Sequence, residues 1–270
     1  MKRRIGWIAA ATAVFGVATA AAGYRNALAD PIVRDLHLPA PIAPTSVVLL
    51  TDSHVAGPDM PPERLARIVA QVNMLKPDVV LLAGDYVSDK AASTRTYPAQ
   101  VAIAPFAALR PRLGTFAVLG NHDHERGAAE MRHSLRAAGV EPLANDAVRA
   151  GPLAIGGLDD ATTDHADLPA TLAALQRIGG FPIVLSHNPD PFKKLSGKVA
   201  LMLAGHTHCG QVRLPILGAL TYGSNYGARY GCGVVREKGR VLVVGAGLGT
   251  SELPSRFGTP PDIWRITIGG

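Results

Sequence analysis

The sequence predicts an α/β domain in which short buried strands alternate with helices. Apolar, β-branched runs recur along the chain, and segments whose apolar residues follow helical spacing stand between them. Most of these runs end in a glycine or a polar cluster, which is where open α/β sheets carry their ligand sites. With 270 residues, of which 47% are hydrophobic, the chain is long enough for one large domain with a full core.

Residues 1–29 are predicted to be a signal or membrane-anchor segment. Residues 5–23 form an uninterrupted apolar and small-residue run after Lys2-Arg3-Arg4, and its length is about that of a minimal membrane span. The basic flank indicates that this end stays in the cytoplasm while the rest of the chain crosses the membrane. We expect an anchor or uncleaved signal. A signal cleaved at Ala27-Leu28-Ala29 and a buried core helix are the alternatives.

The formal net charge of +6 lies mainly in this first segment. The segment contains four basic and no acidic residues, which leaves 23 basic and 21 acidic residues, a net charge of +2, for residues 30–270. A nearly neutral domain lacks the broad basic face that tracks a nucleic-acid backbone. Nucleic acid is therefore not an expected partner.

The two cysteines, Cys209 and Cys232, are too few for a disulfide scaffold. Both lie in glycine-rich stretches, where we expect two unpaired small residues. One bridge between them is the alternative if the domain is exported.

The predicted strands begin after a proline-rich stretch. Residues 30–45 are expected to form an extended linker, and residues 46–270 the folded domain. Short apolar runs predict buried strands at residues 46–50, 78–83, 115–119, 182–185, 199–204, 241–244 and 263–268, with shorter strands near 147–148 and 153–155.

Four helices are predicted between these strands. The first is opened by Pro61-Pro62-Glu63, carries apolar residues at helical spacing and is stopped by Lys76-Pro77. The others are expected over residues 98–109, over 128–138, where Gly139 ends the helix, and over 167–178, where Asp167 is the cap.

Five of the predicted strands end in polar residues that can bind metals. The clusters are Asp52 with His54, Asp85, Asn121 with His122, His187, and His206 with His208. Because ligand sites of open α/β sheets lie at the carboxyl ends of the strands, we expect the five clusters to converge on one place. Residues two apart in an extended chain point the same way, so His206 and His208 can face one pocket.

The types of side chain in these clusters indicate divalent metals. Two aspartates, one asparagine and four histidines offer oxygen and nitrogen donors without a thiolate, which suits Mn, Fe, Zn or Mg. Seven donors exceed what one ion of four to six ligands needs. Two ions that share a bridging carboxylate would use them all, as in two-metal phosphoesterases.

These residues resemble the calcineurin-like metallophosphoesterase family. The family pattern runs D-x-H, G-D, G-N-H-D/E, a lone H and G-H-x-H, and every block is present in order between Ser46 and Ile268. The stretches at residues 205–215, 247–251 and 254–257 are similar to the branch of bacterial membrane-associated phosphodiesterases of the YaeI and YkuE type. That branch usually has a glycine where this chain has Cys209.

The resemblance implies a fold and a division of the ligands. The fold is a four-layer α/β/β/α sandwich of two mixed sheets, here preceded by the N-terminal hydrophobic segment. One ion is held by the side chains of Asp52, His54 and His208, the other by those of Asn121, His187 and His206, and Asp85 bridges the two.

The implied chemistry is in-line attack of a metal-bridging hydroxide on phosphorus. His122 stays free of metal and stabilises charge or donates a proton to the leaving oxygen, while Asp123 orients its ring. The segment 211–233 is rich in glycine, tyrosine and arginine, so Arg213, Tyr226 and Arg229 are candidates to bind the substrate. An irregular surface cover packed by its tyrosines is the alternative for this segment.

The expected function is hydrolysis of phosphodiester bonds by an enzyme with two divalent metal ions. One alternative is a pyrophosphatase acting on a nucleotide-linked lipid such as UDP-2,3-diacylglucosamine, and another is a non-catalytic metal-binding envelope protein. The expected location is the bacterial inner membrane, by an N-terminal anchor, or export, with the catalytic domain on the extracytoplasmic side.

Overall fold

Two six-stranded sheets form the body of the protein in this computed structural model, which describes residues 2–88, 90–214, 216, 218–219 and 221–270. The first sheet has the order β1 (Ile32–Leu38), β16 (Asp262–Ile268), β2 (Thr45–Leu50), β4 (Val79–Ala83), β6 (Thr115–Val118) and β7 (Glu141–Pro142). The second has the order β14 (Gly233–Glu237), β15 (Arg240–Val244), β11 (Leu201–Ala204), β10 (Phe181–Leu185), β9 (Leu153–Gly157) and β8 (Asp146–Ala150).

Both sheets are mixed. The central strands β2, β4 and β6 run parallel, as do β9, β10, β11 and β15. Antiparallel pairs join β2 to β16, β14 to β15 and β8 to β9. Two short pairs lie outside the sheets, β3 (Ala56–Gly57) with β5 (Arg95–Thr96) and β12 (Arg213–Leu214) with β13 (Gly218–Ala219).

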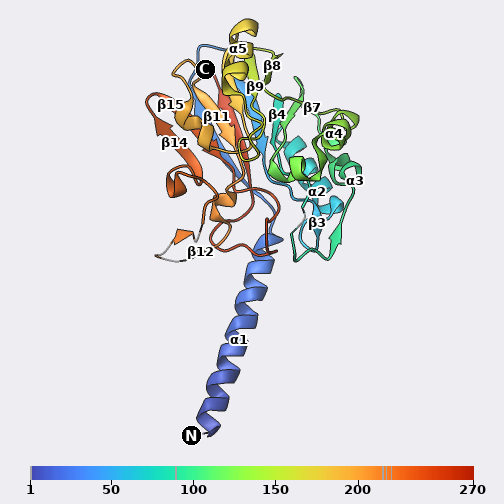
Figure 1. The fold of residues 1–270 in the computed structure, drawn as a ribbon, viewed down its shortest axis with the longest axis vertical. Coiled ribbons are helices and arrows are strands. Elements are labelled where there is room, and N and C mark those ends of the chain that lie inside the picture. The colour runs from blue at the N-terminus through green and yellow to red at the C-terminus, as the bar shows by residue number, and fades with distance from the viewer. Residues whose placement is uncertain (1, 89, 215, 217, 220) are drawn as a thin grey trace.

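The sheets pack face to face, and helices cover their outer faces (Figure 1). Alternation along β2 shows how one strand serves two layers: Val47 and Leu49 belong to the core between the sheets, whereas Val48 and Leu50 belong to the core under the helices. From Val47 to Leu50 every side chain of β2 is buried on one side or the other, which explains the continuous apolar sequence. The four-layer α/β/β/α arrangement agrees with the prediction.

Three helices and one turn cover the first sheet. They are α2 (Pro62–Met74), α3 (Ala99–Ile103), the 3₁₀ turn η1 (Ala104–Ala108) and α4 (Asn121–Ala137). The second sheet is covered by α5 (Leu168–Ile178) and the 3₁₀ turn η2 (Asp190–Lys194), and two further 3₁₀ turns are η3 (His208–Gly210) and η4 (Gly227–Arg229). Helix α4 begins seven residues before the predicted start at 128, because its first turn contains the Asn121-His122-Asp123 block, and it is kinked at Gly127.

The prediction of a linker over residues 30–45 differs from the structure. Residues 32–38 form β1, an edge strand parallel to β16, with Leu36 opposite Ile266. The prolines lie on either side, at Pro31 and from Pro39 onward, so none interrupts the strand. Only the second half of the expected linker therefore remains irregular.

Helix α1 (Lys2–Ala27) leaves the sandwich at one end (Figure 1). Its last turns rest on residues 255–257: the backbone N–H of Arg256 donates to the Gly23 carbonyl at 3.0 Å, and the Asn26 amide donates to the Arg256 carbonyl at 3.2 Å. In the part of the chain that the structure describes, no helix is long and apolar enough to cross a membrane. The side chains of residues 5–11, 13 and 15, which belong to the predicted anchor, lie outside the described ones.

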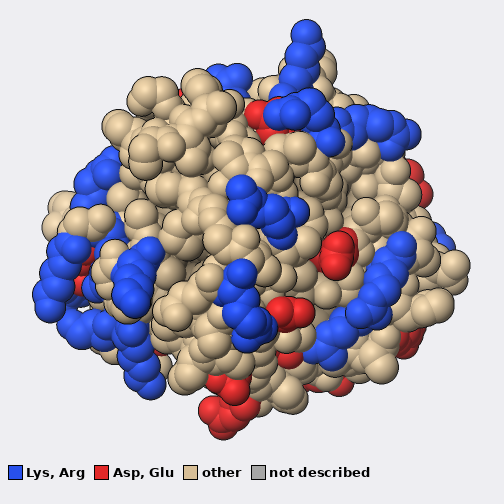
Figure 2. Space-filling model, turned by 90° about the horizontal axis from the view of Figure 1, so that it is seen from above, with Lys and Arg blue, Asp and Glu red and all other residues tan. Residues whose placement is uncertain are grey.

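The face opposite α1 carries charges of both signs. Figure 2 shows its lysine and arginine side chains in separate groups, with acidic and uncharged residues between them. This distribution fits the small net charge of residues 30–270.

Candidate metal centre

All seven predicted ligands lie together at the carboxyl ends of the strands. Asp52 and His54 follow β2, Asp85 follows β4, Asn121 follows β6, His187 follows β10, and His206 and His208 follow β11. Because these strands are neighbours in register within the two packed sheets, residues from distant parts of the sequence meet at one edge.

One group of donors contains Asp52, His54 and His208, whose ligand atoms all lie within 4.8 Å of one another. Nε2 of His54 is 3.0 Å from Nε2 of His208. Nε2 of His208 is 3.7 Å from Asp52 Oδ1, and Nε2 of His54 is 3.4 Å from Asp85 Oδ2. Four donors thus face a common point.

A second group lies on the other side of Asp85. His187 Nε2 is 3.2 Å from Asn121 Oδ1, 3.1 Å from His206 Nδ1 and 3.3 Å from Asp85 Oδ2. The same carboxylate oxygen therefore faces both groups. His206 and His208, although two residues apart, belong to different groups.

The outer ring nitrogens show that this arrangement fits bound cations. Nδ1 of His187 is 2.7 Å from the Ala83 carbonyl, and Nε2 of His206 is 3.1 Å from the Gly223 carbonyl. A ring N–H that donates to a carbonyl leaves the opposite nitrogen with its lone pair toward the centre, as in metal-binding histidines. Mixed nitrogen and oxygen donors without a thiolate suit Mn, Fe, Zn or Mg.

Burial and charge set the protonation of the histidines. Burial lowers the pKa of His54 to about 3 and that of His206 to about 4, so both rings are neutral at pH 7. Burial also lowers the pKa of His187, but the opposing charge of Asp85 outweighs it and raises that pKa to about 10. Without metal, His187 therefore keeps a proton that a metal ion would have to displace.

The two aspartates respond to burial differently. Burial raises the pKa of Asp52 to about 6. Burial acts on Asp85 in the same direction, but the charge and hydrogen bond of His187 prevail and hold the pKa of Asp85 well below its usual range. Asp85 is therefore the ionised carboxylate at the middle of the site.

The glycines of the predicted motifs permit the close approach of the strand ends. A Cβ at Gly120 would clash with Asp85 Oδ1, and one at Gly205 would clash with Asp52 Oδ2. Several ligands themselves have left-handed backbone, with φ of 49° at Asp52, 56° at Asp85 and 69° at His206. Such strained backbone at non-glycine residues is typical of functional sites.

His122 and Asp123 have different surroundings. The His122 ring lies near His54, with ring centroids 5.2 Å apart, and its side chain is 25% exposed. The structure differs from the prediction that Asp123 orients this ring: Asp123 accepts hydrogen bonds from the backbone N–H groups of Asp85, Tyr86 and Gly120. Asp123 thus caps α4 and fixes the Asp85 loop, and Glu125, at 3.5 Å, is the carboxylate beside His122.

Arg256, which no sequence motif marks as a site residue, holds the backbone segment 246–249 next to Asp52. Its fully buried guanidinium donates to the carbonyls of Ala246, Gly247 and Gly249. The same Nη2 is 3.4 Å from Nδ1 of His208. In the sequence, the one indication that Arg256 matters was the similarity of residues 254–257 to bacterial membrane-associated phosphodiesterases of the YaeI and YkuE type.

The expectation that Cys209 and Cys232 are unpaired is wrong: they form a disulfide. Cys209 directly follows the ligand His208, and Cys232 ends the irregular segment that begins at Gln211. Their Cα atoms are 4.6 Å apart although 23 residues separate them in sequence. The bridge therefore fastens this segment beside the site.

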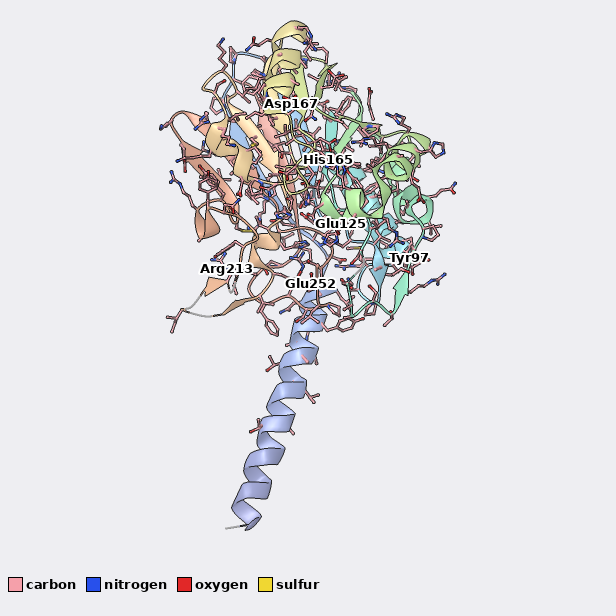
Figure 3. All side chains as sticks on the ribbon, viewed as in Figure 1. Tyr97, Glu125, His165, Asp167, Arg213 and Glu252 are labelled. Carbon is pink, nitrogen blue, oxygen red and sulfur yellow. A yellow bond between two sulfur atoms is a disulfide. The ribbon has the colours of Figure 1, made fainter. Side chains whose placement is uncertain are left out.

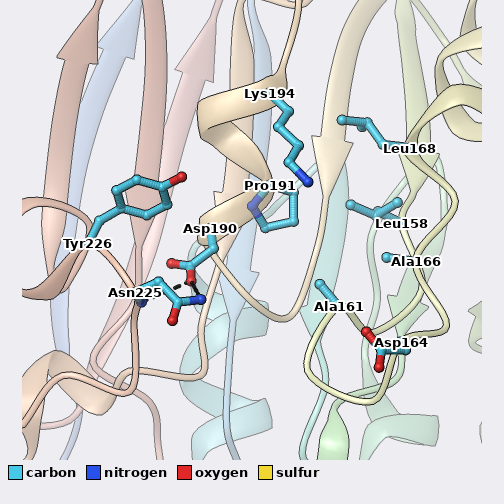
Figure 4. Close-up of a pocket in the computed structure, with 10 residues that line it drawn as sticks. All are labelled: Leu158, Ala161, Asp164, Ala166, Leu168, Asp190, Pro191, Lys194, Asn225 and Tyr226. Carbon is cyan, nitrogen blue, oxygen red and sulfur yellow. Dashed lines mark hydrogen bonds between the residues drawn. The ribbon is translucent and has the colours of Figure 1, made fainter.

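The three candidate substrate residues do not gather around the ligands. Arg229 pairs with Glu237 at 2.6 Å, and Arg213 lies on the short β12–β13 pair toward the α1 end (Figure 3). Tyr226 lines a separate cavity of about 340 Å³, opposite Leu158 and Leu168 and beside Asp190 (Figure 4). Asp190 follows His187 by three residues in sequence, but none of the seven predicted ligands lines this cavity.

A site of paired histidine and carboxylate groups between two mixed sheets defines a class of metal-dependent hydrolytic centre. The family model described as calcineurin-like phosphoesterase matches residues 45–210, which is more than half of the chain. The chain therefore belongs to the calcineurin-like phosphoesterase family.

Similar proteins come from animals and bacteria. A transmembrane protein with metallophosphoesterase domain from Danio rerio is 30% identical over 91% of this chain and 59% of its own length. The uncharacterised metallophosphoesterase YkuE of Bacillus subtilis is 31% identical over 82% of this chain and 78% of its own. The chain thus spans less than two thirds of the Danio rerio protein.

A solved structure shows the same fold. The NAD nucleotidase NadN of Haemophilus influenzae superposes with a TM-score of 0.50 at 17% identity, over 77% of this chain and 46% of that protein. At this identity the likeness concerns the fold alone.

Proposed function

We propose that the chain is a phosphoesterase that uses two divalent metal ions to hydrolyse phosphodiester bonds. The observation that carries the proposal is the position of Asp85 Oδ2, 3.4 Å from His54 Nε2 in one donor group and 3.3 Å from His187 Nε2 in the other. A carboxylate shared between two donor groups is what a two-ion site requires. When bound, the ion pair would lower the pKa of a water and neutralise charge that develops on the phosphoryl oxygens.

The residues around the ligands supply the remaining tasks. His122 is not one of the seven predicted ligands, although one of its ring nitrogens lies within 4.8 Å of ligand atoms of His54 and Asp85. Its side chain is partly exposed, so its ring can donate a proton to the leaving oxygen. Its backbone N–H donates to Asp85 Oδ1 at 3.1 Å, which keeps Oδ2 turned toward the ligands. A site that served only the fold would have no use for an uncommitted histidine at its open side.

A cavity next to the predicted ligands favours a diester over a monoester. It has a volume of about 420 Å³ and His206 and His208 in its wall, whereas none of the predicted ligands lines the 340 Å³ cavity of Figure 4. A phosphodiester has a second substituent, and the cavity beside His206 and His208 can receive it.

We place the catalytic domain on the extracytoplasmic side of the inner membrane. The disulfide beside the site supports this placement, because such bonds persist in oxidising compartments. The apolar run and its basic flank at the N-terminus support an anchor there.

The test is hydrolysis by the purified chain after its metals are removed and Mn²⁺ is restored. We expect bis(p-nitrophenyl) phosphate to be hydrolysed faster than p-nitrophenyl phosphate, and both rates to vanish when the metal is chelated. Cleavage of a UDP-linked lipid without diester hydrolysis would favour the pyrophosphatase. Full metal binding with rates no higher than those of Asp85→Ala would leave a non-catalytic metal protein.

A further inference from the structure

The 420 Å³ cavity next to His206 and His208 has a distinctive wall. Val212, Tyr222 and Leu253 contribute apolar side chains from three separate segments, and Leu253 is 60% exposed. Among the described residues that line it, Glu252 is the only one with a formal charge at pH 7 when the histidines are neutral. The wall therefore offers apolar surface next to the metal ligands and no cation to bind a second phosphate.

The wall of this cavity is fixed by hydrogen bonds. The Gln211 side chain donates to the Leu253 carbonyl at 3.0 Å and accepts from the Ser251 backbone N–H at 2.8 Å. These two bonds join the segment after the ligands to the segment 251–253.

A buried ion pair between Lys90 and Asp59 holds Thr250, the residue before the segment 251–253. Thr250 lies in a buried cluster, where its hydroxyl donates to Asp59 at 2.8 Å and accepts from Lys90 at 3.0 Å. Lys90 and Asp59 also contact each other at 2.5 Å, and both side chains are fully buried. The apolar wall is thus preformed, which lowers the entropic cost of binding.

The cavity lies at the end of the molecule from which α1 leaves. Residues 251–253 lead directly into residues 255–257, which hold Gly23 of α1. Figure 3 shows Arg213 and Glu252 at this same end of the body. A substrate whose apolar part lies alongside α1 would therefore approach the end of the protein that carries the cavity.

The second cavity offers a contrast. Asp164, Asp190, Lys194 and Asn225 give it charged and hydrogen-bonding groups (Figure 4). The two cavities therefore favour substituents of different polarity.

We propose that the cavity formed by Val212, Tyr222 and Leu253 binds an apolar substituent of the phosphoester, either an alkyl chain or an aryl ring. This inference rests on the proposed function, because it assigns one of the two substituents of that substrate. Burial of hydrocarbon against these side chains stabilises the complex without taking part in the reaction, so it lowers KM.

The test uses four diesters that share a p-nitrophenyl leaving group and differ in the second substituent: methyl, octyl, phenyl or 5′-thymidyl. We expect KM to be at least roughly tenfold lower for the octyl or phenyl ester than for the methyl ester, since burial of about two methylenes suffices for that factor. A gain with octyl alone assigns a lipid-like chain, and a gain with phenyl alone assigns an aromatic group. Equal KM values for methyl, octyl and phenyl, or a gain with thymidyl alone, would overturn the proposal.

A matched pair of variants locates the effect. Leu253→Asp should abolish the KM difference between octyl and methyl esters, whereas Met74→Asp should preserve it. Met74 is a 74% exposed apolar residue on α2, so it controls for a carboxylate added to exposed apolar surface. If Leu253→Asp does not fold, Leu253→Ala should reduce the same difference. A difference retained in a folded Leu253 variant would overturn the assignment.

A binding experiment tests this inference independently of the proposed function. If no diester is hydrolysed, the proposed function fails, but calorimetry of the metal-loaded chain with octylphosphonate and methylphosphonate still shows whether the cavity binds an alkyl chain. Tighter binding of octylphosphonate that is lost in Leu253→Asp supports the apolar subsite. Equal binding of the two phosphonates contradicts it.

Discussion

The metal centre and the segment 211–233 lie side by side but are built in different ways. Each predicted ligand of the centre lies within four residues of the end of a buried strand, so the register of two sheets fixes its position. The described residues of the segment 211–233 form a two-residue strand pair, a short turn and the first residue of β14, and the segment is held by the Cys209–Cys232 bridge and by side-chain hydrogen bonds.

This difference indicates a division of labour. A ligand set fixed by sheet register can keep its chemistry while the neighbouring segment changes, and that segment can change the substrate without disturbing the ligands. Substitutions in the centre should therefore change metal content and rate, whereas those in the segment should change KM. The following predictions test that contrast.

The largest effect is expected for Asp85→Asn. The change removes the charge that faces both donor groups, so bound metal should fall from two ions to one or none and hydrolysis should fall to the level of the metal-free chain. Metal analysis and diester hydrolysis on the same sample check both. Retention of two ions would show that Asp85 does not join the groups.

His122→Ala should separate chemistry from metal binding. Loss of a general acid typically costs about 10²–10⁴-fold in rate, while both ions should remain because all seven predicted ligands are kept. The measurements are kcat and metal content. Loss of an ion in this variant would make His122 a ligand.

Arg256→Met should weaken the group that contains Asp52 and His208. Arg256 donates to the carbonyls of Ala246, Gly247 and Gly249, and the backbone N–H of Gly249 donates to the Asp52 carbonyl, so loss of this support should cost about 10–100-fold in metal affinity. Arg240→Met is the control, because Arg240 is also buried and donates to the carbonyls of Phe192 and Leu195 from the first residue of β15, whereas the predicted ligands follow the carboxyl ends of their strands. Equal metal affinity in the two variants would mean that Arg256 acts on stability alone.

The affinity for metal should rise with pH. Since the raised pKa of His187 keeps its proton up to about pH 10, a metal ion must displace one proton at pH 7–9, and affinity should change about tenfold per pH unit. Burial raises the pKa of Asp52 to about 6, so below pH 6 this carboxyl is also protonated and the metal must displace a second proton. Metal affinity should then depend more steeply on pH. Calorimetry in buffers of different ionisation enthalpy counts these protons, and a release of none at pH 8 would contradict the assignment of His187.

The smallest effect on catalysis is expected for Cys232→Ser. Loss of the bridge should cost about 2–4 kcal/mol of unfolding free energy and loosen the segment 211–233. We expect KM to rise while two ions and kcat are retained. A fall in metal content would show that the bridge also positions His208.

The sequence predicted the ligands because each directly follows an apolar strand. Periodicity fixes the strand ends, and the glycines before Asp85, Asn121 and His206 mark the close approaches. Patterns along the chain cannot show contacts between irregular segments, and for that reason the pairing of Cys209 with Cys232 was missed. The contact of Arg256 with His208 was missed for the same reason, since the two residues are 48 positions apart.

Two local features were missed for other reasons. The strand at residues 32–38 lies at a sheet edge between prolines, where composition resembles that of a linker. The partner of Asp123 could not be predicted because a carboxylate in a first helical turn can either orient a neighbouring ring or cap the helix, and here it caps the helix.

The central claim is that Asp85 joins two metal sites into one catalytic centre. The most direct measurement is the amount of metal bound per chain, followed together with the rate of diester hydrolysis as Mn²⁺ is added to the metal-free protein. We expect two ions per chain and a rate that rises fully only when the second ion binds. Full activity with one ion per chain would contradict it.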